Sequence, residues 1–367
     1  MTILNSLDFY KLTMSQFQLK HHPDLSVELT LKNRDNDKIN IDWRELGYKL
    51  NETWFTYSDL EKLRGIGCSK DWVYALENAQ RPYVFVDDQH VSVRGPWWLA
   101  TLFETVIMSE ITEAYNGGER VLELPESFKD NIWFMNESVQ TNFFDFGTRR
   151  RFSLATHRQV IEYLIENAYG FAGTSNVGLA LEYELPMIGT HAHEMFMVYA
   201  GLYKDNMRQS QYKLLSEWVA MFPSLNTMLT DTFGTEQFLM DLPNELLDKY
   251  IAFRQDSGDP FAYGDMLIGF LIGRGINPKT KTIVFSDGLD VGTMGRLHRK
   301  FSNRIGIKFG WGTGLTNPYN ERKLNIVVKP TKLFVGTEQR GLVKLSDTPG
   351  KESGSTSNVN YYRKVFA

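Results

Sequence analysis

The 367-residue sequence is 42% apolar and 13% aromatic, which is enough to bury one or two sizeable cores. Its 40 basic residues nearly balance its 44 acidic ones, and the densest basic run is the triplet 149–151, so we expect no nucleic-acid partner. The single Cys68 excludes an internal disulfide and a cysteine-based metal site. Without a secretory-type N-terminus or an apolar stretch of the ~20 residues that span a membrane, the expected location is the cytoplasm.

Residues 1–138 combine strand-like and helix-like patterns. Two runs of alternating apolar and polar residues, SVELTLKNR and YVFVDDQHVSVRG, predict strands. After Gly95 and Pro96, the amphipathic stretch WWLATLFETVIMSEITEAYN predicts a helix. We therefore expect residues 1–138 to form an α+β domain.

Residues 139–334 show a different pattern, in which short apolar or β-branched runs each end in glycine and polar residues. Seven such runs follow one another: FFDFGT, GFAGTSN, LPMIGTHAH, NTMLTDT, IAFRQDSGD, TIVFSDG and IKFGWGTG. In parallel α/β barrels the chemistry gathers at the carboxyl ends of the strands, where these polar residues stand. We therefore predict an α/β protein with an irregular seven-stranded barrel over 139–334, while 335–367 return to complete the N-terminal α+β domain.

Three of the strand ends suit anions. The string DFGTRRRF, 145–152, places three guanidinium groups after an aromatic residue, and arginine holds carboxylate or phosphate through two parallel hydrogen bonds. The strings VFSDGLDVGTMGRL and KFGWGTGLTN each combine a strand, a glycine loop and a helix, which offer phosphate free amides and the positive end of a helix dipole. A solvated loop and ordinary turns are the alternatives.

Two further strings carry groups suited to catalysis. RQDSGDP, 254–260, offers carboxylates, a hydroxyl and a guanidinium to a polyhydroxyl or metal–phosphate group, although it also suits a plain turn. In GTHAHE, 189–194, two histidines stand two residues apart. On a strand they would point to one face, as a metal clamp requires, and Glu194 would point to the other. The pair is a candidate metal clamp, a reactive nucleophile or core packing.

Nine strings, in order along nearly the whole chain, match one known family: DFYKLTM, GPWWLATLFE, FGTRRRFS, GTSNVGLA, GTHAHE, RQDSGDP, VFSDGLDV, FGWGTGLTN and KLSDTPGK. They resemble nicotinate phosphoribosyltransferase, of the type II phosphoribosyltransferases. The resemblance implies an enzyme that joins nicotinate to phosphoribosyl pyrophosphate (PRPP), coupled to ATP hydrolysis through a phosphohistidine and assisted by Mg²⁺. The product would be nicotinate mononucleotide, a precursor in NAD biosynthesis.

The resemblance also implies roles for single residues. His193 is the expected phosphate acceptor, and His191 becomes a packing neighbour. Asp256 and Asp287 would serve ribose hydroxyls or the hydrated metal, and Mg²⁺ would be held through pyrophosphate rather than directly by the protein. The expected nicotinate-binding residues are Tyr10, Phe146, Arg149, Thr174, Ser175 and Thr190. The expected PRPP- and phosphate-binding residues are Arg254, Ser257, Gly288, Gly312, Thr313 and Gly314.

Two of these residues bear on assembly and substrate choice. Phe146 and Tyr10 would cover the two faces of the base, with Tyr10 supplied by the other subunit of a homodimer. Nicotinamide-using relatives carry Asp after Gly-Thr, whereas this chain has Ser175, and a carboxylate there would repel nicotinate. The acid is therefore the expected base, with nicotinamide and quinolinate as alternatives.

The last strand end departs from the family pattern F-G-I-G-T-N-L-T-N-D, because Trp311, Gly314 and Pro318 occupy three of its positions. These changes put PRPP binding and ATP coupling in question, so a catalytically silent nucleotide-binding protein is a further alternative. A metal-dependent barrel hydrolase is another, since H-x-H on a strand can bind a divalent cation. The remaining histidines, however, lie before the barrel or in helix-like segments.

Overall fold

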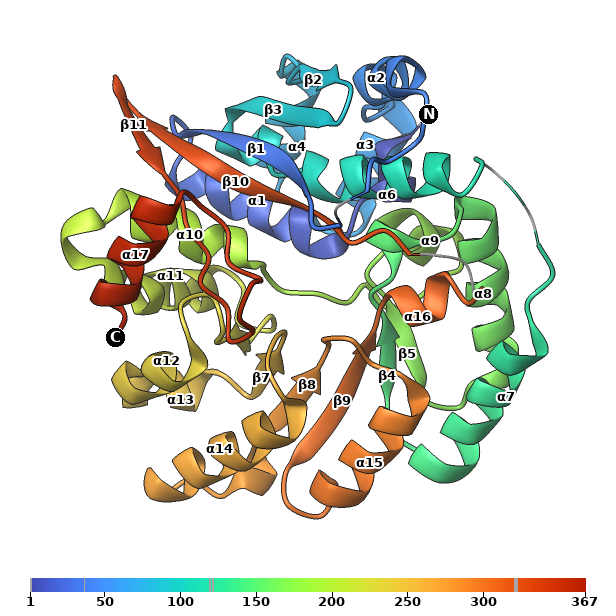
Figure 1. The fold of residues 1–367 in the computed structure, drawn as a ribbon, viewed down its shortest axis with the longest axis vertical. Helices are drawn as coiled ribbons and strands as arrows, with labels where there is room; N and C mark the ends of the chain where they lie inside the picture. Colours follow the sequence, from blue (N-terminus) through green and yellow to red (C-terminus); the bar gives the residue numbers. More distant parts are fainter. Residues whose placement is uncertain (1, 36, 119, 121, 320–322) are drawn as a thin grey trace.

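Two sheets organise the molecule, an antiparallel sheet in the upper half of Figure 1 and a parallel sheet in the lower half. The computed structural model describes residues 2–35, 37–118, 120, 122–319 and 323–367. The antiparallel sheet has the strand order β11-β10-β1-β3-β2, and the parallel sheet has the order β5-β4-β9-β8-β7-β6. The expected combination of an α/β barrel with a separate α+β layer is confirmed.

The elements have the following bounds. The strands are β1 (Ser26–Asn33), β2 (Val84–Asp87), β3 (His90–Pro96), β4 (Phe143–Asp145), β5 (Phe171–Thr174), β6 (Thr227–Leu229), β7 (Ala252–Gln255), β8 (Thr282–Phe285), β9 (Gly306–Trp311), β10 (Ile326–Val335) and β11 (Glu338–Gly341). The helices before the barrel are α1 (Phe9–His21), α2 (Trp43–Glu52), α3 (Tyr57–Gly65), α4 (Lys70–Asn78), α5 (Trp97–Ala100), α6 (Phe103–Tyr115) and α7 (Glu126–Phe134). The later helices are α8 (Leu154–Asn167), α9 (Val177–Glu182), α10 (His193–Leu202), α11 (Met207–Met221), α12 (Thr235–Asp241), α13 (Asn244–Lys249), α14 (Pro260–Gly273), α15 (Val291–Phe301), α16 (Thr313–Thr316) and α17 (Thr356–Val365).

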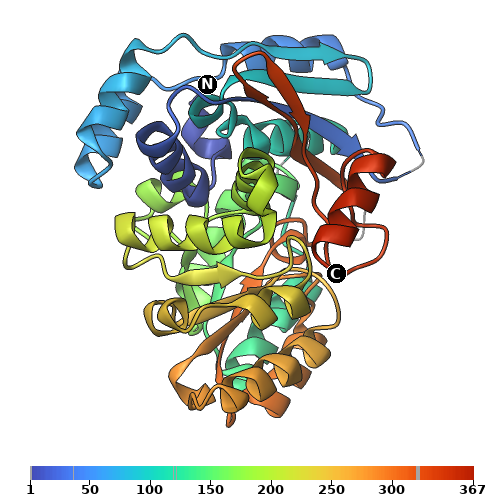
Figure 2. The ribbon, with the colours of Figure 1, turned by 90° about the vertical axis from the view of Figure 1, so that its left-hand side faces the viewer.

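β1 and β10 form the centre of the antiparallel sheet. They pair over the full length of β1, from Ser26 opposite Phe334 to Asn33 opposite Ile326. The inward-facing residues of β1 are buried, as its alternating sequence predicts, and the helices pack beneath this layer in Figure 2. The C-terminal return therefore begins at Ile326 and not at the expected position 335, because Ile326 already pairs with Asn33 of β1.

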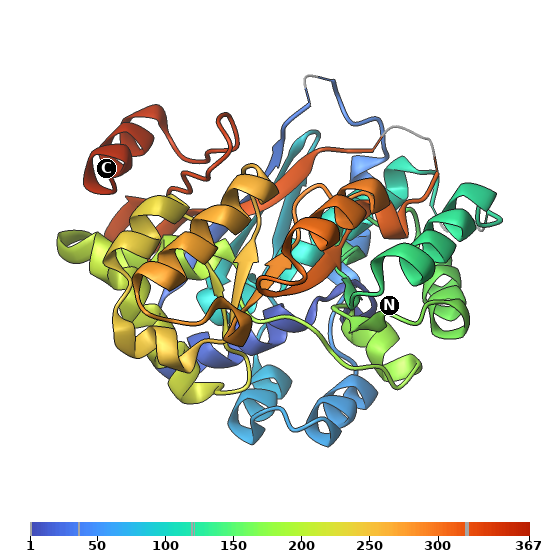
Figure 3. The same cartoon turned by 90° about the horizontal axis from the view of Figure 1, so that it is seen from below.

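Six of the seven expected barrel strands form, and the third does not. The run LPMIGTHAH contributes only an isolated parallel bridge between Met187 and Thr174. Pro186 has no N–H to give to a ladder, and Gly189 adopts a φ of 144°, so the segment does not continue as a regular strand. It runs beside β5, at an edge of the sheet, while helices surround the strands in the view of Figure 3.

His193 begins a helix instead of lying in a strand. α10 starts at this residue, directly after its N-cap Ala192. Strand parity therefore does not relate His193 to His191, and the expectation that the two share a strand face is wrong. In the first turn of α10, His193 and Glu194 point in directions about 100° apart, since a helix has about 3.6 residues per turn.

The C-terminal segment contacts the barrel as well as the antiparallel sheet. After β11 the chain crosses to the end of β6, where the Leu345 amide donates to the Thr232 carbonyl at 2.8 Å. The Gly258 amide donates to Thr348 Oγ1 at 2.9 Å. α17 then packs beside the barrel, with Phe366 stacked on Phe233 at 4.2 Å between ring centroids. Residues 342–355 thus form a strap across one end of the barrel (Figure 1).

α14 packs against α15, and Gly264 on its buried face lies beneath the ring of Phe301 from α15. Gly269 lies on the same helix, where a Cβ would meet no neighbouring group. Although α14 is the most apolar of the long helices, no helix in the described part of the chain is both long and apolar enough to cross a membrane.

We predict opposite effects for two alanine substitutions in α14. A Cβ at position 264 would lie 2.5 Å from Phe301 Cζ, so Gly264→Ala should lower the melting temperature, with an overpacking cost of about 1–3 kcal/mol. Gly269→Ala meets no neighbour and removes backbone freedom, so it should raise stability by about 0.5–1 kcal/mol. Thermal and urea denaturation of both variants measure the difference. Equal effects would show that contact with Phe301 does not limit position 264.

Candidate active site

A cavity of about 290 Å³ lies at the carboxyl ends of the parallel strands. Its walls come from residues after β4, β5, β7, β8 and β9, from the start of α1, from β10 and from the strap 342–355. The expected site residues that line it are Tyr10, Phe146, Arg149, Ser175, His193, Arg254, Asp256, Asp287, Gly288, Gly312, Thr313 and Gly314. Strand ends of the barrel and both terminal regions of the chain therefore build one site.

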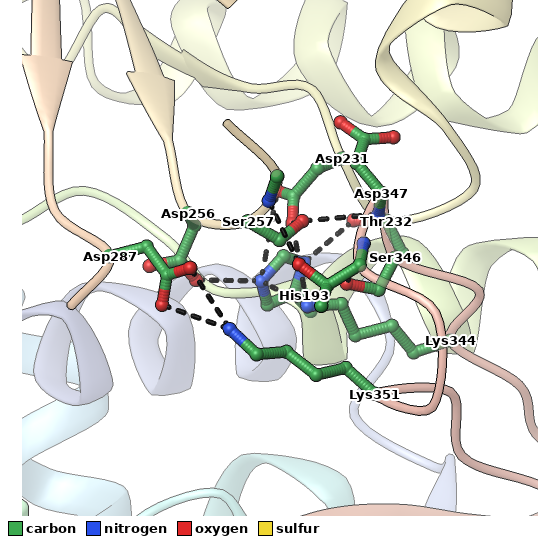
Figure 4. Close-up of polar contacts among 12 residues, drawn as sticks. His193, Asp231, Thr232, Asp256, Ser257, Asp287, Lys344, Ser346, Asp347 and Lys351 are labelled. Carbon is green, nitrogen blue, oxygen red and sulfur yellow. Dashed lines mark hydrogen bonds and ion pairs between the residues drawn. The ribbon is translucent and has the colours of Figure 1, made fainter. Parts of the chain in front are cut away.

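His193 is held by groups from three other elements, which Figure 4 shows converging on its ring. Its Nδ1 lies 3.0 Å from Thr232 Oγ1, and its Nε2 lies 2.8 Å from Asp256 Oδ2. Lys344 of the strap brings its Nζ to 3.0 Å from Nε2 and to 3.5 Å from Asp231 Oδ2. The imidazole thus stands between two carboxylates and an ammonium group.

Burial lowers the pKa of His193 to about 4, and Lys344 adds to this effect, while Asp231 and Asp256 oppose it. The ring is therefore neutral near pH 7 and carries one N–H. Nε2 faces both Asp256 Oδ2, which can only accept, and the Lys344 ammonium, which can only donate, so it can hydrogen-bond to only one of them at a time. When Nε2–H donates to Asp256, the closer of the two, Lys344 keeps its contact with Asp231, and the lone pair of the ring lies on Nδ1 beside the Thr232 hydroxyl. A neutral imidazole oriented by a carboxylate is the usual arrangement for a nucleophilic or basic histidine.

Each of the two carboxylates at the ends of β7 and β8, Asp256 and Asp287, forms an ion pair with one basic side chain. Arg254 Nη2 lies 2.9 Å from Asp256 Oδ1, and Lys351 of the strap lies 2.9 Å from Asp287 Oδ2. Burial opposes ionisation of Asp256, but Arg254 and His193 hold its pKa well below the usual range. The basic side chains of these pairs can bind the oxygens of a polyanion, and the carboxylates can accept hydrogen bonds from a polyhydroxyl group.

Four polar residues of the site received no role from the sequence: Thr232, Asp231 and Lys344, which surround His193, and Lys351, which pairs with Asp287. Asp231 follows β6 in the run NTMLTDT, and Lys344 and Lys351 are the first and last residues of KLSDTPGK. That last string was part of the family resemblance, but nothing in it indicates that it folds back over the barrel. The long-range pairing of β10 with β1 is what carries both lysines to the cavity.

Tyr10 lines the cavity of its own chain, so the expectation that a second subunit supplies it is wrong. The start of α1 is tied to the end of β5, because the Phe9 amide donates to the Ser175 carbonyl at 2.7 Å. An antiparallel bridge joins Asp8 to Asn176 beside it. These backbone contacts place Tyr10 within the site, and the argument for a homodimer that rested on Tyr10 no longer holds.

Three expected site residues lie behind the cavity lining. Thr174 donates to Asp145 Oδ2 at 2.5 Å, and His157 contacts the same oxygen at 2.6 Å. Ser257 donates to Asp231. The carbonyl of Thr190 accepts from Thr13 Oγ1 at 2.9 Å. None of the three side chains lines the cavity, and they support the residues that do.

Asp8 also lines the cavity, although no motif in the sequence pointed to it. Its carboxylate accepts a hydrogen bond from Ser175 Oγ at 2.7 Å. Burial raises the pKa of Asp8, although Arg149 acts in the opposite direction. This part of the cavity therefore contains a carboxyl group even though position 175 is a serine. A preference for nicotinate over nicotinamide must come from other residues.

His191 packs in the core. Its ring is fully buried and meets Trp218 edge to face at 5.0 Å and Phe196 at 5.4 Å between centroids. Burial lowers the pKa of His191 to about 3, so the ring is uncharged. Among the described residues, no group of three or more His, Cys, Asp or Glu side chains is arranged to hold a metal ion. The H-x-H pair thus consists of one cavity histidine and one core histidine.

The departures at the last strand end compensate one another sterically. Trp311 is buried and meets Phe143 edge to face at 5.9 Å, so its indole fills the barrel core. A Cβ at position 314 would lie 2.9 Å from Trp311 Nε1, closer than real contacts allow. Gly314 is therefore the residue that makes room for the larger Trp311, and the backbone of 312–314 still borders the cavity.

The comparisons with known proteins point to one family. Residues 141–367 match the model of the nicotinate phosphoribosyltransferase (NAPRTase) family. A relative from Ectopseudomonas mendocina named nicotinate phosphoribosyltransferase is 34% identical over 98% of this chain and 95% of its own length. Nicotinate phosphoribosyltransferase 1 of Pseudomonas aeruginosa is 35% identical over the same shares of the two chains.

Two solved structures superpose on nearly the whole chain. The crystal structure of nicotinate phosphoribosyltransferase from Porphyromonas gingivalis superposes with a TM-score of 0.91 at 27% identity, covering 99% of this chain and 98% of that one. The enzyme of the same name from Vibrio cholerae gives a TM-score of 0.87 at 30% identity, covering 99% and 93% of the two chains.

We predict that His193 stays neutral from about pH 8 to about pH 5, because its pKa is lowered to about 4. In Asp256→Asn the pKa should fall further, because the hydrogen bond to the carboxylate stabilises the charged ring. A ¹⁵N-edited NMR titration of the imidazole signals, with His193→Ala for assignment, measures both values. A midpoint near the ordinary imidazole value of ~6.5, or a higher pKa in Asp256→Asn, would contradict the arrangement.

Proposed function

The chain belongs to the nicotinate phosphoribosyltransferase family, and from this premise we propose that its reaction is coupled to ATP through His193. The full reaction is nicotinate, PRPP, ATP and water to nicotinate mononucleotide, pyrophosphate, ADP and phosphate. The product would feed NAD biosynthesis. The observation that carries the proposal is the neutral, doubly anchored imidazole of His193 at the wall of the cavity.

The phosphoryl step uses the free lone pair of the ring. Nδ1 of His193 attacks the γ-phosphorus of ATP, the bond to the bridging oxygen breaks, and ADP leaves with that electron pair. The ring becomes cationic while Nε2–H stays bound to Asp256, whose carboxylate stabilises the charge. Lys344 lies next to the ring and can neutralise the transferred phosphoryl oxygens. Water later removes the phosphoryl group as phosphate.

The glycosyl step needs an ordered anion and an aligned base. The pyridine nitrogen attacks the anomeric carbon of PRPP as the bond to pyrophosphate breaks, and cationic character develops on the ribose. Arg254 and Lys351 would neutralise phosphate oxygens, and the backbone of 312–314 would hold the 5′-phosphate. Asp256 and Asp287 would accept hydrogen bonds from the ribose hydroxyls once the substrate replaces part of their present pairing.

Mg²⁺ fits this site as a substrate-bound ion. Hard oxygen ligands are present in Asp256 and Asp287, but each carboxylate is already paired with a cation. These two residues would therefore meet the ion through its water shell, while pyrophosphate oxygens hold it directly. When bound, the ion supplies charge neutralisation to the leaving pyrophosphate.

The base would lie in the slot formed by Tyr10 and Phe146, with its carboxylate toward Arg149. Nicotinate is the base in the names of the relatives, and nicotinamide and quinolinate are the alternatives to test. A catalytically silent protein is disfavoured, because Trp311 and Gly314 compensate one another and leave the cavity border in place.

We predict that mononucleotide forms from nicotinate with PRPP and Mg²⁺, and that ATP stimulates the reaction. Chromatography of reactions with nicotinate, nicotinamide or quinolinate, each with and without ATP, identifies the base. Product from nicotinamide alone would overturn the base assignment, and the absence of any mononucleotide would overturn the function.

We predict that His193→Ala abolishes ATP stimulation and ³²P transfer from ATP, while some PRPP-dependent synthesis remains, because only the phosphate acceptor is lost. His90→Ala on the exposed end of β3 is the control and should retain both properties. ATP stimulation that survives in His193→Ala would show that another group accepts the phosphate.

A further inference from the structure

Two cations line the cavity and converge on one buried carboxylate. Glu104 of α6 is 1% exposed, and its Oε1 lies 3.1 Å from Lys329 Nζ of β10 and 3.8 Å from Arg149 Nη1. Arg149 and Lys329 both line the cavity. Two like charges approach one another here because Glu104 lies between them and attracts both.

A second ion pair fixes Glu104 from behind. Its Oε2 lies 2.5 Å from Nζ of Lys11, a fully buried residue of α1, and the same Nζ lies 2.7 Å from Glu194 Oε2. Trp97 Nε1 donates to Glu194 Oε1 at 2.7 Å. Three other segments, α1, β10 and the loop after β4, thus hold the Glu104 carboxylate directly, so that the positions of both cavity cations follow from it.

The cluster of Lys11, Arg149, Lys329, Glu104 and Glu194 is one negative charge short, since it contains three cations and two carboxylates. Arg149, whose side chain is 33% exposed, also feels Asp8 and Asp256 of the cavity lining. Burial opposes ionisation of Glu104, but Lys11, Lys329 and Arg149 hold its pKa well below the usual range. Burial and the nearby Arg149 lower the pKa of Lys329, while Glu104 opposes the decrease. A bound carboxylate would supply the missing charge.

We propose that Lys329 and Arg149 form a clamp for the carboxylate of the pyridine base, that Glu104 positions both cations, and that Lys329 determines the preference for acid over amide. The inference rests on the proposed function for the identity of the base. Asp8 already places a carboxyl group in the cavity, so the lack of an acid at position 175 does not explain why an acidic base would be preferred. A pair of cations facing the base does explain it.

The location of the clamp favours the base over the phosphates. Arg149 and Lys329 line the same cavity as Tyr10, one wall of the aromatic slot, and Lys11, the next residue after Tyr10, binds Glu104 at 2.5 Å. The groups suited to phosphate stand on other elements, at the strand ends and on the strap, where Arg254 and Lys351 pair with Asp256 and Asp287. A carboxylate on a ring held in the slot would meet the clamp, and a neutral amide would leave its extra charge unpaired.

Lys329→Gln removes the charge and keeps a polar group beside Glu104. We expect the KM for nicotinate to rise roughly 10- to 100-fold, as for loss of a charged hydrogen bond, while the KM for PRPP stays within about 2-fold. The ratio of kcat/KM between nicotinate and nicotinamide should fall by a similar factor, and Lys329→Arg should retain most of it. Steady-state kinetics with each base measures these quantities.

Lys332→Gln is the matched control, since Lys332 lies on the same strand but is half-exposed and pairs with Glu28 away from the cavity. It should change neither KM. A rise in the PRPP KM of Lys329→Gln, or an unchanged preference for nicotinate, would overturn the clamp.

Glu104→Gln tests the positioning role. The nicotinate KM should rise while kcat at saturating nicotinate changes little, because the cations are displaced but the reacting atoms are not. Glu104→Asp should restore part of the affinity. A variant in which kcat falls and KM does not would show that Glu104 acts on the chemical step or on folding instead.

Calorimetric binding of nicotinate and nicotinamide, without PRPP, separates the clamp from the proposed function. If the wild-type protein binds nicotinate in preference to nicotinamide and Lys329→Gln loses this preference, the clamp holds even where no mononucleotide forms. If mononucleotide forms normally and Lys329→Gln binds nicotinate as the wild type does, the function holds and the clamp fails.

Discussion

The ladder between β1 and β10 is the contact on which the candidate site depends. The eight residues of β1 pair with residues of β10 between Ile326 and Phe334, and this pairing turns the C-terminal part of the chain back across the strand ends. Lys329 lies in the ladder itself, and Lys344 and Lys351 follow it on the strap. The basic wall of the cavity is therefore a product of sheet formation in the other layer.

Local patterns were sufficient for most of the framework. The short apolar runs that end in glycine correctly predicted six parallel strands, because most residues of these strands are buried, as in the apolar runs that parallel sheets require. The third run failed for a local reason that the sequence also contains. Pro186 and Gly189 break the ladder, and His193 consequently starts a helix. The apolar composition of LPMIGTHAH predicted a strand, and the presence of Pro186 and Gly189 was given too little weight against it.

The site was harder to predict where it depends on contacts between distant segments. Strand-end motifs placed Asp256 and the glycine loops correctly at the cavity, since the strand ends of a parallel barrel meet on one side. Nothing local indicates that Asp8 would bond to Ser175, or that backbone contacts of Asp8 and Phe9 with the end of β5 place Tyr10 in the cavity of its own chain. Contacts between residues so far apart in the chain arise from tertiary packing, and a local sequence pattern does not predict them.

A ribosome delivers β1 and the whole barrel before it delivers β10. During most of translation β1 therefore has only β3 as a partner, and its other edge presents unpaired N–H and C=O groups. The nascent barrel is able to form its ring of helices, but its cavity lacks the lysines of β10 and the strap. Pairing of β10 closes the exposed edge of β1, and the strap that follows β11 then brings Lys344 and Lys351 to the cavity, so the cavity is complete only after this edge is covered.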